Sequence, residues 1–241
     1  MTVLVGLNLG THVVVISDTR SMSVNPMPGQ KIFKNNRRKR HLSVNSATVY
    51  GGIERISKDV AGLIRYQSVK SYKCFEVVID FLKGLPSTTE TDIGYFERLA
   101  AISGLHKDGA VELIYHNLYR FIDDGFVRKS GIVEIGNACI SYPGTITKKE
   151  SHILDGRINE VLCSFFINSG NKFKPSNRSA LGKLIIQVTG VLTELAKVKS
   201  EISSKFNVCV KDSEGNMIGG TVNLSKKTKI KWHSLSGNQF S

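Results

Sequence analysis

The sequence predicts an α+β protein built as a four-layer α-β-β-α sandwich, on two observations. Strand-like and helix-like segments come in blocks, in the order hairpins, two helices, hairpins, two helices and closing strands. Each pair of amphipathic helices must cover one face of a sheet, and the strands suffice for two sheets. A chain of 241 residues with 41% hydrophobic residues can bury a large core. We therefore expect residues 1–241 to form one domain.

The first block consists of β-branched, apolar runs. Residues 3–9 and 12–17 flank a turn-forming segment at 8–11, which predicts a hairpin that begins at the second residue. Residues 31–34 and 42–50 predict a second hairpin, because a polar, basic stretch separates these two apolar runs.

Periodicity and turn signals predict the remaining elements. Apolar residues at helical spacing predict helices at 53–66, 74–82, 149–166 and 179–200. Short apolar runs bounded by Gly- and Asp-containing turns predict strands at 99–103, 110–115, 131–140, 206–210 and 217–224, with a last strand ending at Trp232.

The net charge of +13 raises the question of a nucleic-acid partner. One basic cluster exists, NNRRKRH at 35–41, and we expect it to form the solvent-exposed tip of the second hairpin. The other basic residues are scattered, and no zinc finger, RNA-binding signature or clear helix-turn-helix accompanies them. We favour solubility or attraction to acidic partners as the role of these charges. Residues 37–40 remain a candidate docking patch, with nucleic-acid binding through them as the alternative.

Other features bear on the compartment. We find no apolar run that approaches the ~20 residues of a membrane span, and no basic segment that would begin a signal peptide. The four cysteines, Cys74, Cys139, Cys163 and Cys209, form no Cys-x-x-Cys pair. We expect a cytoplasmic protein with reduced thiols, no bound metal and no membrane partner.

The most informative feature is a buried strand that begins beside Thr2. Removal of Met1, which is usual when a small residue follows, would leave a free α-amine on Thr2. The pKa of an α-amine is about 7.7–8.0, so it can act as the base for the hydroxyl of its own residue. A hydroxyl is a poor nucleophile without such help. Asp18 ends the next strand and Lys31 begins the third, so both can return beside Thr2.

These motifs resemble a known family. The segments VLVG at 3–6, HVVVISDTRSM at 12–22, QKIF at 30–33 and TVYGGIERISKDVAGLI at 48–64 are similar to the catalytic β-type subunits of the proteasome family, above all its simple bacterial members. The resemblance covers about the first 65 residues, and beyond them only the order of elements agrees.

That resemblance implies an N-terminal-nucleophile hydrolase with the α-β-β-α fold. It implies a threonine peptidase that cleaves polypeptides inside a ring-shaped homo-oligomer without a cofactor. Some members of the family receive their substrates from an ATPase that unfolds them, which would be a further partner.

The resemblance also implies a role for each matching residue. Thr2 would be the nucleophile and, through its amine, the base. Asp18 would orient a lysine that lowers the pKa of the hydroxyl, and the Gly51 amide would donate to the oxyanion. The first specificity pocket would be lined by Ser21, Val49 and Ile53, whose apolar character favours cleavage after a hydrophobic residue.

Two lysines compete for the catalytic position. Asp18 follows Thr2 by 16 positions, as in the family. Lys34 follows Asp18 by 16 positions, which is the family spacing, and Lys31 follows it by 13. We favour Lys31, because two apolar residues continue a strand after it, whereas Lys34 precedes the polar run NNRRKR. A shortened loop between Asp18 and Lys31 would account for the difference in spacing.

Two parts of the chain depart from the family pattern. The Gly-Ser pair that supports the amine is replaced by Gly136-Asn137, with Ser141 as the alternative. Glu201 and Ser204 have the three-residue spacing of the family's late Asp and Ser but lack the surrounding glycines. These departures keep two other functions open: a non-catalytic structural member of the same fold, and an acyl or peptidyl transferase that uses Thr2.

Overall fold

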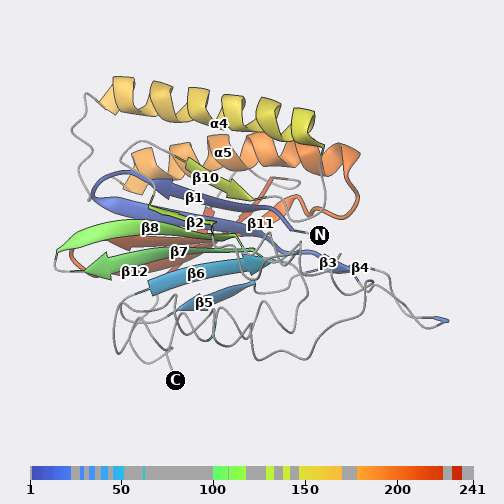
Figure 1. Ribbon diagram of the computed structural model, residues 1–241, viewed down its shortest axis with the longest axis horizontal. Coiled ribbons are helices and arrows are strands. Elements are labelled where there is room, and N and C mark those ends of the chain that lie inside the picture. The colour runs from blue at the N-terminus through green and yellow to red at the C-terminus, as the bar shows by residue number, and fades with distance from the viewer. Residues whose placement is uncertain are drawn as a thin grey trace.

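A computed structural model confirms the α+β architecture. A pair of helices, a six-stranded sheet and a five-stranded sheet are stacked in that order (Figure 1). The second helical layer, predicted at 53–66 and 74–82, lies outside the described residues, apart from the helical Gly62. The structure describes residues 2–22, 28–29, 33–35, 39–42, 46–51, 62, 100–107, 109–117, 129–132, 138–141, 147–169, 178–224 and 230–234.

The six-stranded sheet is antiparallel throughout, in the order β10-β1-β2-β11-β12-β13. The predicted first hairpin is confirmed as β1 and β2, joined at Gly10, whose positive φ of 81° suits glycine. The strands are β1 (Leu4–Asn8), β2 (His12–Asp18), β10 (Ala138–Ser141), β11 (Lys205–Asp212), β12 (Met217–Asn223) and β13 (Ile230–Ser234).

The five-stranded sheet is also antiparallel and follows the order β5-β6-β7-β8-β9. Two short strands, β3 (Ser21–Met22) and β4 (Phe33–Lys34), form a separate ladder. The five strands are β5 (Arg40–Leu42), β6 (Ser46–Gly51), β7 (Ala100–Lys107), β8 (Ala110–Asn117) and β9 (Lys129–Ile132).

Three strand predictions were wrong in the extent of a strand or in the strand with which it pairs. The run 42–50 is not one strand, because β5 and β6 pair with each other. Residues 33–34 pair with β3 and not with that run. The run 131–140 is divided between β9 and β10, which are edge strands of different sheets. A continuous apolar run does not reveal such a division, because the strands that each half joins are distant in sequence.

The two helices, α4 (Lys148–Ser169) and α5 (Arg178–Val198), cover the outer face of the six-stranded sheet (Figure 1). A capping box starts α4: Glu150 N donates to Thr147 Oγ1 over 3.2 Å, and Thr147 N donates to Glu150 Oε2 over 2.7 Å. By length and hydropathy, residues Ser179–Val198 could also span a membrane, which we did not predict. In this fold the fully buried Leu184, Ile185 and Leu192 pack in the core between helices and sheet.

Alternation along the strands divides the core into two clusters. On β1 and just before it, Val3, Val5 and Leu7 belong to the cluster under the helices, whereas Leu4 belongs to the cluster between the sheets. Because successive side chains point to opposite faces, Thr2 lies on the same face as Leu4, towards the five-stranded sheet. The six-stranded sheet is therefore covered on both faces, which explains why β1 and β2 are buried along their whole length.

The two sheets approach most closely at glycines. A Cβ placed on Gly6 would lie 2.6 Å from both Ile102 Cγ2 and Leu113 Cδ1. A Cβ placed on Gly104 would lie 2.5 Å from Val13 Cγ1. Side chains at these two positions would push the sheets apart, so the glycines set the inter-sheet spacing near β1 and β2.

We therefore expect Gly6→Ala to lower the free energy of unfolding by about 1–3 kcal/mol, because the new methyl group overpacks the inter-sheet core. Gly156→Ala is the control, since a Cβ on this α4 residue meets nothing within 4 Å. It should raise the free energy of unfolding by up to about 1 kcal/mol through helix propensity. Urea denaturation measures both, and equal effects would contradict the close approach.

Candidate active site

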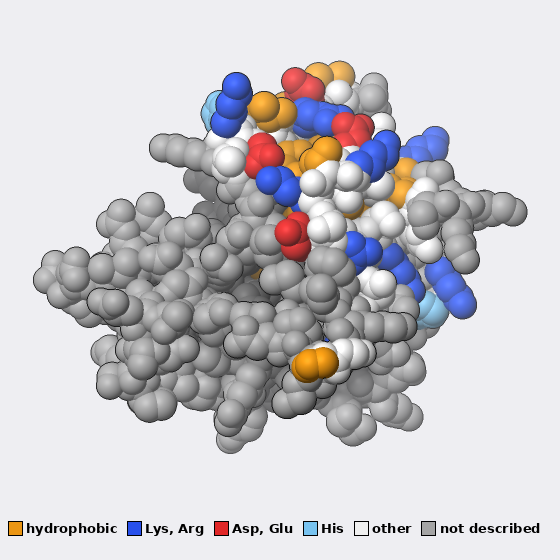
Figure 2. Space-filling view, turned by 90° about the vertical axis from the view of Figure 1, so that its right-hand side faces the viewer, with side chains coloured by type: hydrophobic (Ala, Val, Ile, Leu, Met, Phe, Trp, Pro, Cys, Tyr) orange, Lys and Arg blue, Asp and Glu red, His pale blue; other side chains and the backbone are white. Residues whose placement is uncertain are grey.

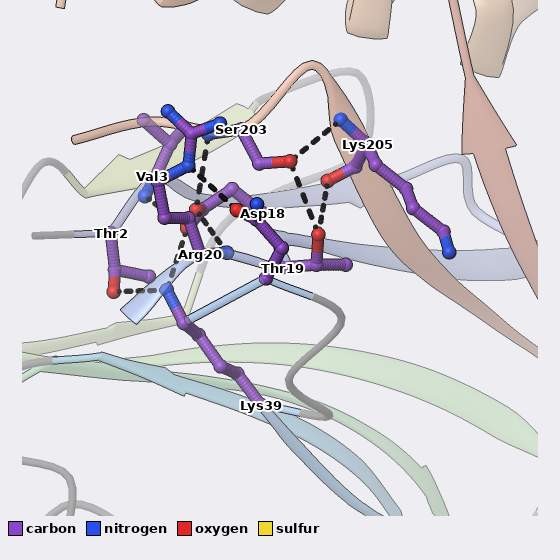
Figure 3. Close-up of polar contacts among 9 residues, drawn as sticks. Thr2, Val3, Asp18, Thr19, Arg20, Lys39, Ser203 and Lys205 are labelled. Atoms are coloured by element: carbon purple, nitrogen blue, oxygen red, sulfur yellow. Dashed lines mark hydrogen bonds and ion pairs between the residues drawn. The ribbon is translucent and has the colours of Figure 1, made fainter. Parts of the chain in front are cut away.

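A buried threonine, lysine and aspartate meet where β1 begins, β2 ends and β5 begins (Figure 3). Lys39 Nζ lies 2.7 Å from Thr2 Oγ1 and 2.9 Å from Asp18 Oδ1. Asp18 is fully buried, and Thr2 and Lys39 are only 3% and 7% exposed. Lys39 directly precedes β5, so its side chain crosses from the five-stranded sheet to the six-stranded one.

The carboxylate of Asp18 accepts hydrogen bonds on both oxygens. Oδ1 accepts from Val3 N at 3.2 Å as well as from Lys39. Oδ2 accepts from Arg20 N at 2.9 Å and from Ser203 N at 3.4 Å. One cation and three backbone amides thus stabilise its negative charge and fix its orientation.

The segment between α5 and β11 contacts the residues at and just after the end of β2. Ser203 Oγ lies 3.2 Å from Thr19 Oγ1 and accepts from Lys205 N at 3.0 Å (Figure 3). The Arg20 guanidinium donates to Ser200 O and, over 2.8 Å, to Asn35 Oδ1. These contacts hold the Ser203 amide against Asp18, although the two residues are far apart in sequence.

The backbone of Gly51 lies against Thr2. A Cβ placed on Gly51 would lie 2.8 Å from both Cβ and Cγ2 of Thr2, and 3.3 Å from its Oγ1. A residue with a side chain would displace Thr2. The site therefore needs glycine at the end of β6 for its close backbone approach.

This geometry favours the ionised form of the Thr2 hydroxyl. An ammonium group 2.7 Å away stabilises an alkoxide by charge and by hydrogen bonding. A charged lysine carries three donors and no acceptor, so Lys39 cannot take the hydroxyl proton while it is paired with Asp18. If the hydroxyl is to ionise, a base other than Lys39 has to accept its proton.

The structure brings together three of the predicted residues, namely Thr2, Asp18 and Gly51. In the described part of the chain, the lysine that contacts Thr2 and Asp18 is Lys39, which we did not predict. Lys31 itself lies outside the described residues, and the competing Lys34 is exposed on β4 opposite Ser21.

Lys39 was missed because we treated 42–50 as one strand and 35–41 as an exposed tip. The usable signal is pairing with the Gly51 strand: Tyr50 N donates to Lys39 O over 3.2 Å. A lysine at the start of the strand that pairs with β6 is carried to the end where Gly51 lies. Sequence spacing did not reveal this, because Lys39 follows Asp18 by 21 positions and the spacing favoured only Lys31 or Lys34.

The predicted pocket residues are placed differently from one another. Ser21 is half-buried in β3. Val49 is fully buried in the core between the sheets, on the same face of β6 as the Gly51 approach to Thr2. Ile53 lies outside the described residues.

Of the four predicted supporting residues, the structure describes Ser141, Glu201 and Ser204. Asn137 lies outside the described residues, and Ser141 stands opposite Leu4 in the β10–β1 ladder. Glu201 and Ser204 are partly exposed in the segment before β11, but Ser203, between them, makes the contact with Asp18. The contact uses a backbone amide, which residue type does not signal.

The basic cluster at 35–41 is not simply an exposed tip. Lys39 is buried in the site, and Arg40 donates from Nη1 to Val208 O at 3.5 Å and to Cys209 Sγ at 3.4 Å. Two of the four residues of the candidate docking patch therefore point into the protein. Elsewhere, on the described part of the face in Figure 2, Lys and Arg side chains lie among acidic, neutral and apolar ones.

Within the described ranges, no group of three or more His, Cys, Asp or Glu side chains is placed to hold a metal ion. Comparison of the sequence with protein-family models gave no match, and comparison with curated proteins gave no relative.

We expect Asp18→Ala to lower the free energy of unfolding by about 3–5 kcal/mol, because it leaves the Lys39 ammonium buried without a counter-charge. Adding Lys39→Met should recover part of that loss. The control is Glu194→Ala, which breaks the exposed Glu194–Arg157 pair of 2.6 Å and should change stability little. Urea unfolding at pH 7 compares the three variants. An equal loss of stability in Asp18→Ala and in the double variant Asp18→Ala/Lys39→Met would argue against the buried pair.

Proposed function

We propose that this chain is the catalytic subunit of a threonine peptidase, an N-terminal-nucleophile hydrolase of the proteasome type. The observation that carries this proposal is the position of the Thr2 hydroxyl, 2.7 Å from the Lys39 ammonium and against the backbone of Gly51. The cation would favour an alkoxide, and we propose the Gly51 amide as the donor to the oxyanion that forms when the alkoxide attacks a carbonyl carbon.

The base in this proposal is the α-amine of Thr2, freed by removal of the residue before it. Amine and hydroxyl belong to the same residue, so the proton can pass between them directly or through one water. Lys39 is the only cation that contacts Thr2 among the described residues, and its pairing with Asp18 leaves it a donor. A separate base is therefore required, and the amine titrates near neutral pH.

The proposed reaction has two stages. The amine accepts the hydroxyl proton while Oγ1 attacks the peptide carbonyl carbon, and the Gly51 amide donates to the oxyanion that forms. The C–N bond then breaks, the leaving amine takes the proton, and an ester on Thr2 remains. Water, deprotonated by the same α-amine, attacks the ester and releases the acid product and the hydroxyl.

The proposal also includes a fourth layer of the fold and the assembly of the subunits. We propose that residues 53–66 and 74–82 form a second helical pair on the outer face of the five-stranded sheet, which completes the α-β-β-α sandwich. The subunits would assemble into a ring around the Thr2 sites. Admission of polypeptides to that chamber would then require an unfolded substrate, delivered by an ATPase partner or already disordered.

We expect Thr2→Ala to abolish peptide cleavage, and Lys39→Met to lower kcat by at least about 10²-fold, because the alkoxide loses its counter-charge. Fluorogenic peptides with hydrophobic residues before the cleaved bond provide the assay. Lys183→Met, on the exposed face of α5, removes an equal charge and should leave the rate unchanged.

Intact mass, with and without a covalent probe that needs both the hydroxyl and the α-amine of an N-terminal threonine, tests the chemistry directly. The wild type should lack Met1 and gain one probe per chain. Retained Met1 without cleavage would instead favour the non-catalytic member of the fold. Products that incorporate an added amine in place of water would identify a transferase.

Gly51→Ala should reduce the rate by about 10²–10³-fold, because its methyl group would overlap Thr2 and move both the nucleophile and the oxyanion donor. Mass labelling by the same probe should fall in parallel. Gly156→Ala is the matched glycine control and should cleave at the wild-type rate. A fully active Gly51→Ala variant would contradict the proposed contact between Gly51 and Thr2.

A further inference from the structure

Arg40 follows Lys39 in the chain and also reaches across to the opposite sheet. Its Nη1 donates to Cys209 Sγ at 3.4 Å and to Val208 O at 3.5 Å. Both acceptors belong to β11, the strand next to β2, which carries Asp18. Neighbouring residues at the start of β5 thus send two cations to adjacent strands of the six-stranded sheet.

Lys39 and Arg40 lie at the start of a short edge strand. Among the described residues, β5 has three residues and pairs with β6. A short edge strand with one neighbour opens more readily than a central strand. Lys39, just before it, has a long flexible side chain and must nevertheless keep its ammonium 2.7 Å from Thr2 Oγ1.

The partners of Arg40 argue for an anchoring role. Cys209 is fully buried, and burial raises the pKa of its thiol despite the nearby guanidinium, so it remains a neutral, weak acceptor. A carbonyl and a neutral thiol bind a guanidinium less strongly than a carboxylate would. These contacts can nevertheless fix the position of Arg40, because both acceptors belong to β11, which lies between β2 and β12.

We propose that Arg40 is a positioning residue: it ties the start of β5 to β11 and so holds Lys39 in place against Thr2 and Asp18. The catalytic consequence depends on the proposed peptidase function. The structural consequence does not, because it concerns only the order of the segment that carries Lys39.

The structural test is amide hydrogen exchange in the full chain. Tyr50 N donates to Lys39 O, so its exchange reports on the pairing of the Lys39 segment with β6. Arg40→Met should speed exchange of the Tyr50 amide about tenfold and leave the Val14 amide of central β2 unchanged. Arg40→Lys, which keeps a donor on a similar stem, should recover part of the protection. Unchanged Tyr50 exchange in Arg40→Met would overturn the proposal.

The kinetic test uses the same variants with peptide substrates. Arg40→Met should lower kcat about tenfold or more with little change in KM, because misplacing Lys39 affects the nucleophile more than substrate binding. Arg40→Lys should lie between, and Lys183→Met should match the wild type. Faster exchange with an unchanged kcat would overturn the catalytic part. A wild type without cleavage would refute the peptidase function, while the exchange result would still decide the anchoring role.

Discussion

The buried ion pair between Lys39 and Asp18 is the interaction on which the site depends. Its two charges come from different sheets, so it forms only when the sheets are stacked in one register. Removing both ions from water is costly, and the attraction between them offsets that cost only with good geometry and further hydrogen bonds. Asp18 has those bonds, from three backbone amides as well as from the lysine. The pair is therefore better understood as fixing the position of the Thr2 hydroxyl than as a source of stability.

Small residues make this crossing possible. Glycine at positions 6 and 104 lets the two sheets approach until side chains of one contact the backbone of the other. Gly51 lets the end of β6 approach Thr2 in the same way. The apolar cluster between the sheets, which includes Leu4, Val15 and Val49, lies beside the site. Burial of Thr2, Asp18 and Lys39 strengthens the electrostatic interactions among them.

In this protein the positions of individual basic residues indicate more about the site than the net charge does. The sequence shows +13 and one conspicuous basic run. In the fold, two members of that run, Lys39 and Arg40, donate hydrogen bonds to residues of the opposite sheet, Thr2 and Cys209. Hydropathy could not reveal this, because a run of charged residues between apolar strands is usually exposed. Nor could the spacing from Asp18, since Lys39 follows it by 21 positions, whereas the two lysines weighed from the sequence, Lys31 and Lys34, follow it by 13 and 16.

The sequence by itself determined the local elements and half of the site. β-branched runs specified β1 and β2, helical periodicity specified α4 and α5, and the position of Thr2 and Asp18 at the ends of one hairpin followed from those strands. Only the tertiary structure decided the identity of the lysine, the contact of Ser203 with Asp18 and the division of residues 131–140 between two sheets. Each of these depends on pairing between segments distant in the chain. Local propensity describes a residue's own backbone, whereas partners across sheets are chosen by packing of the whole fold.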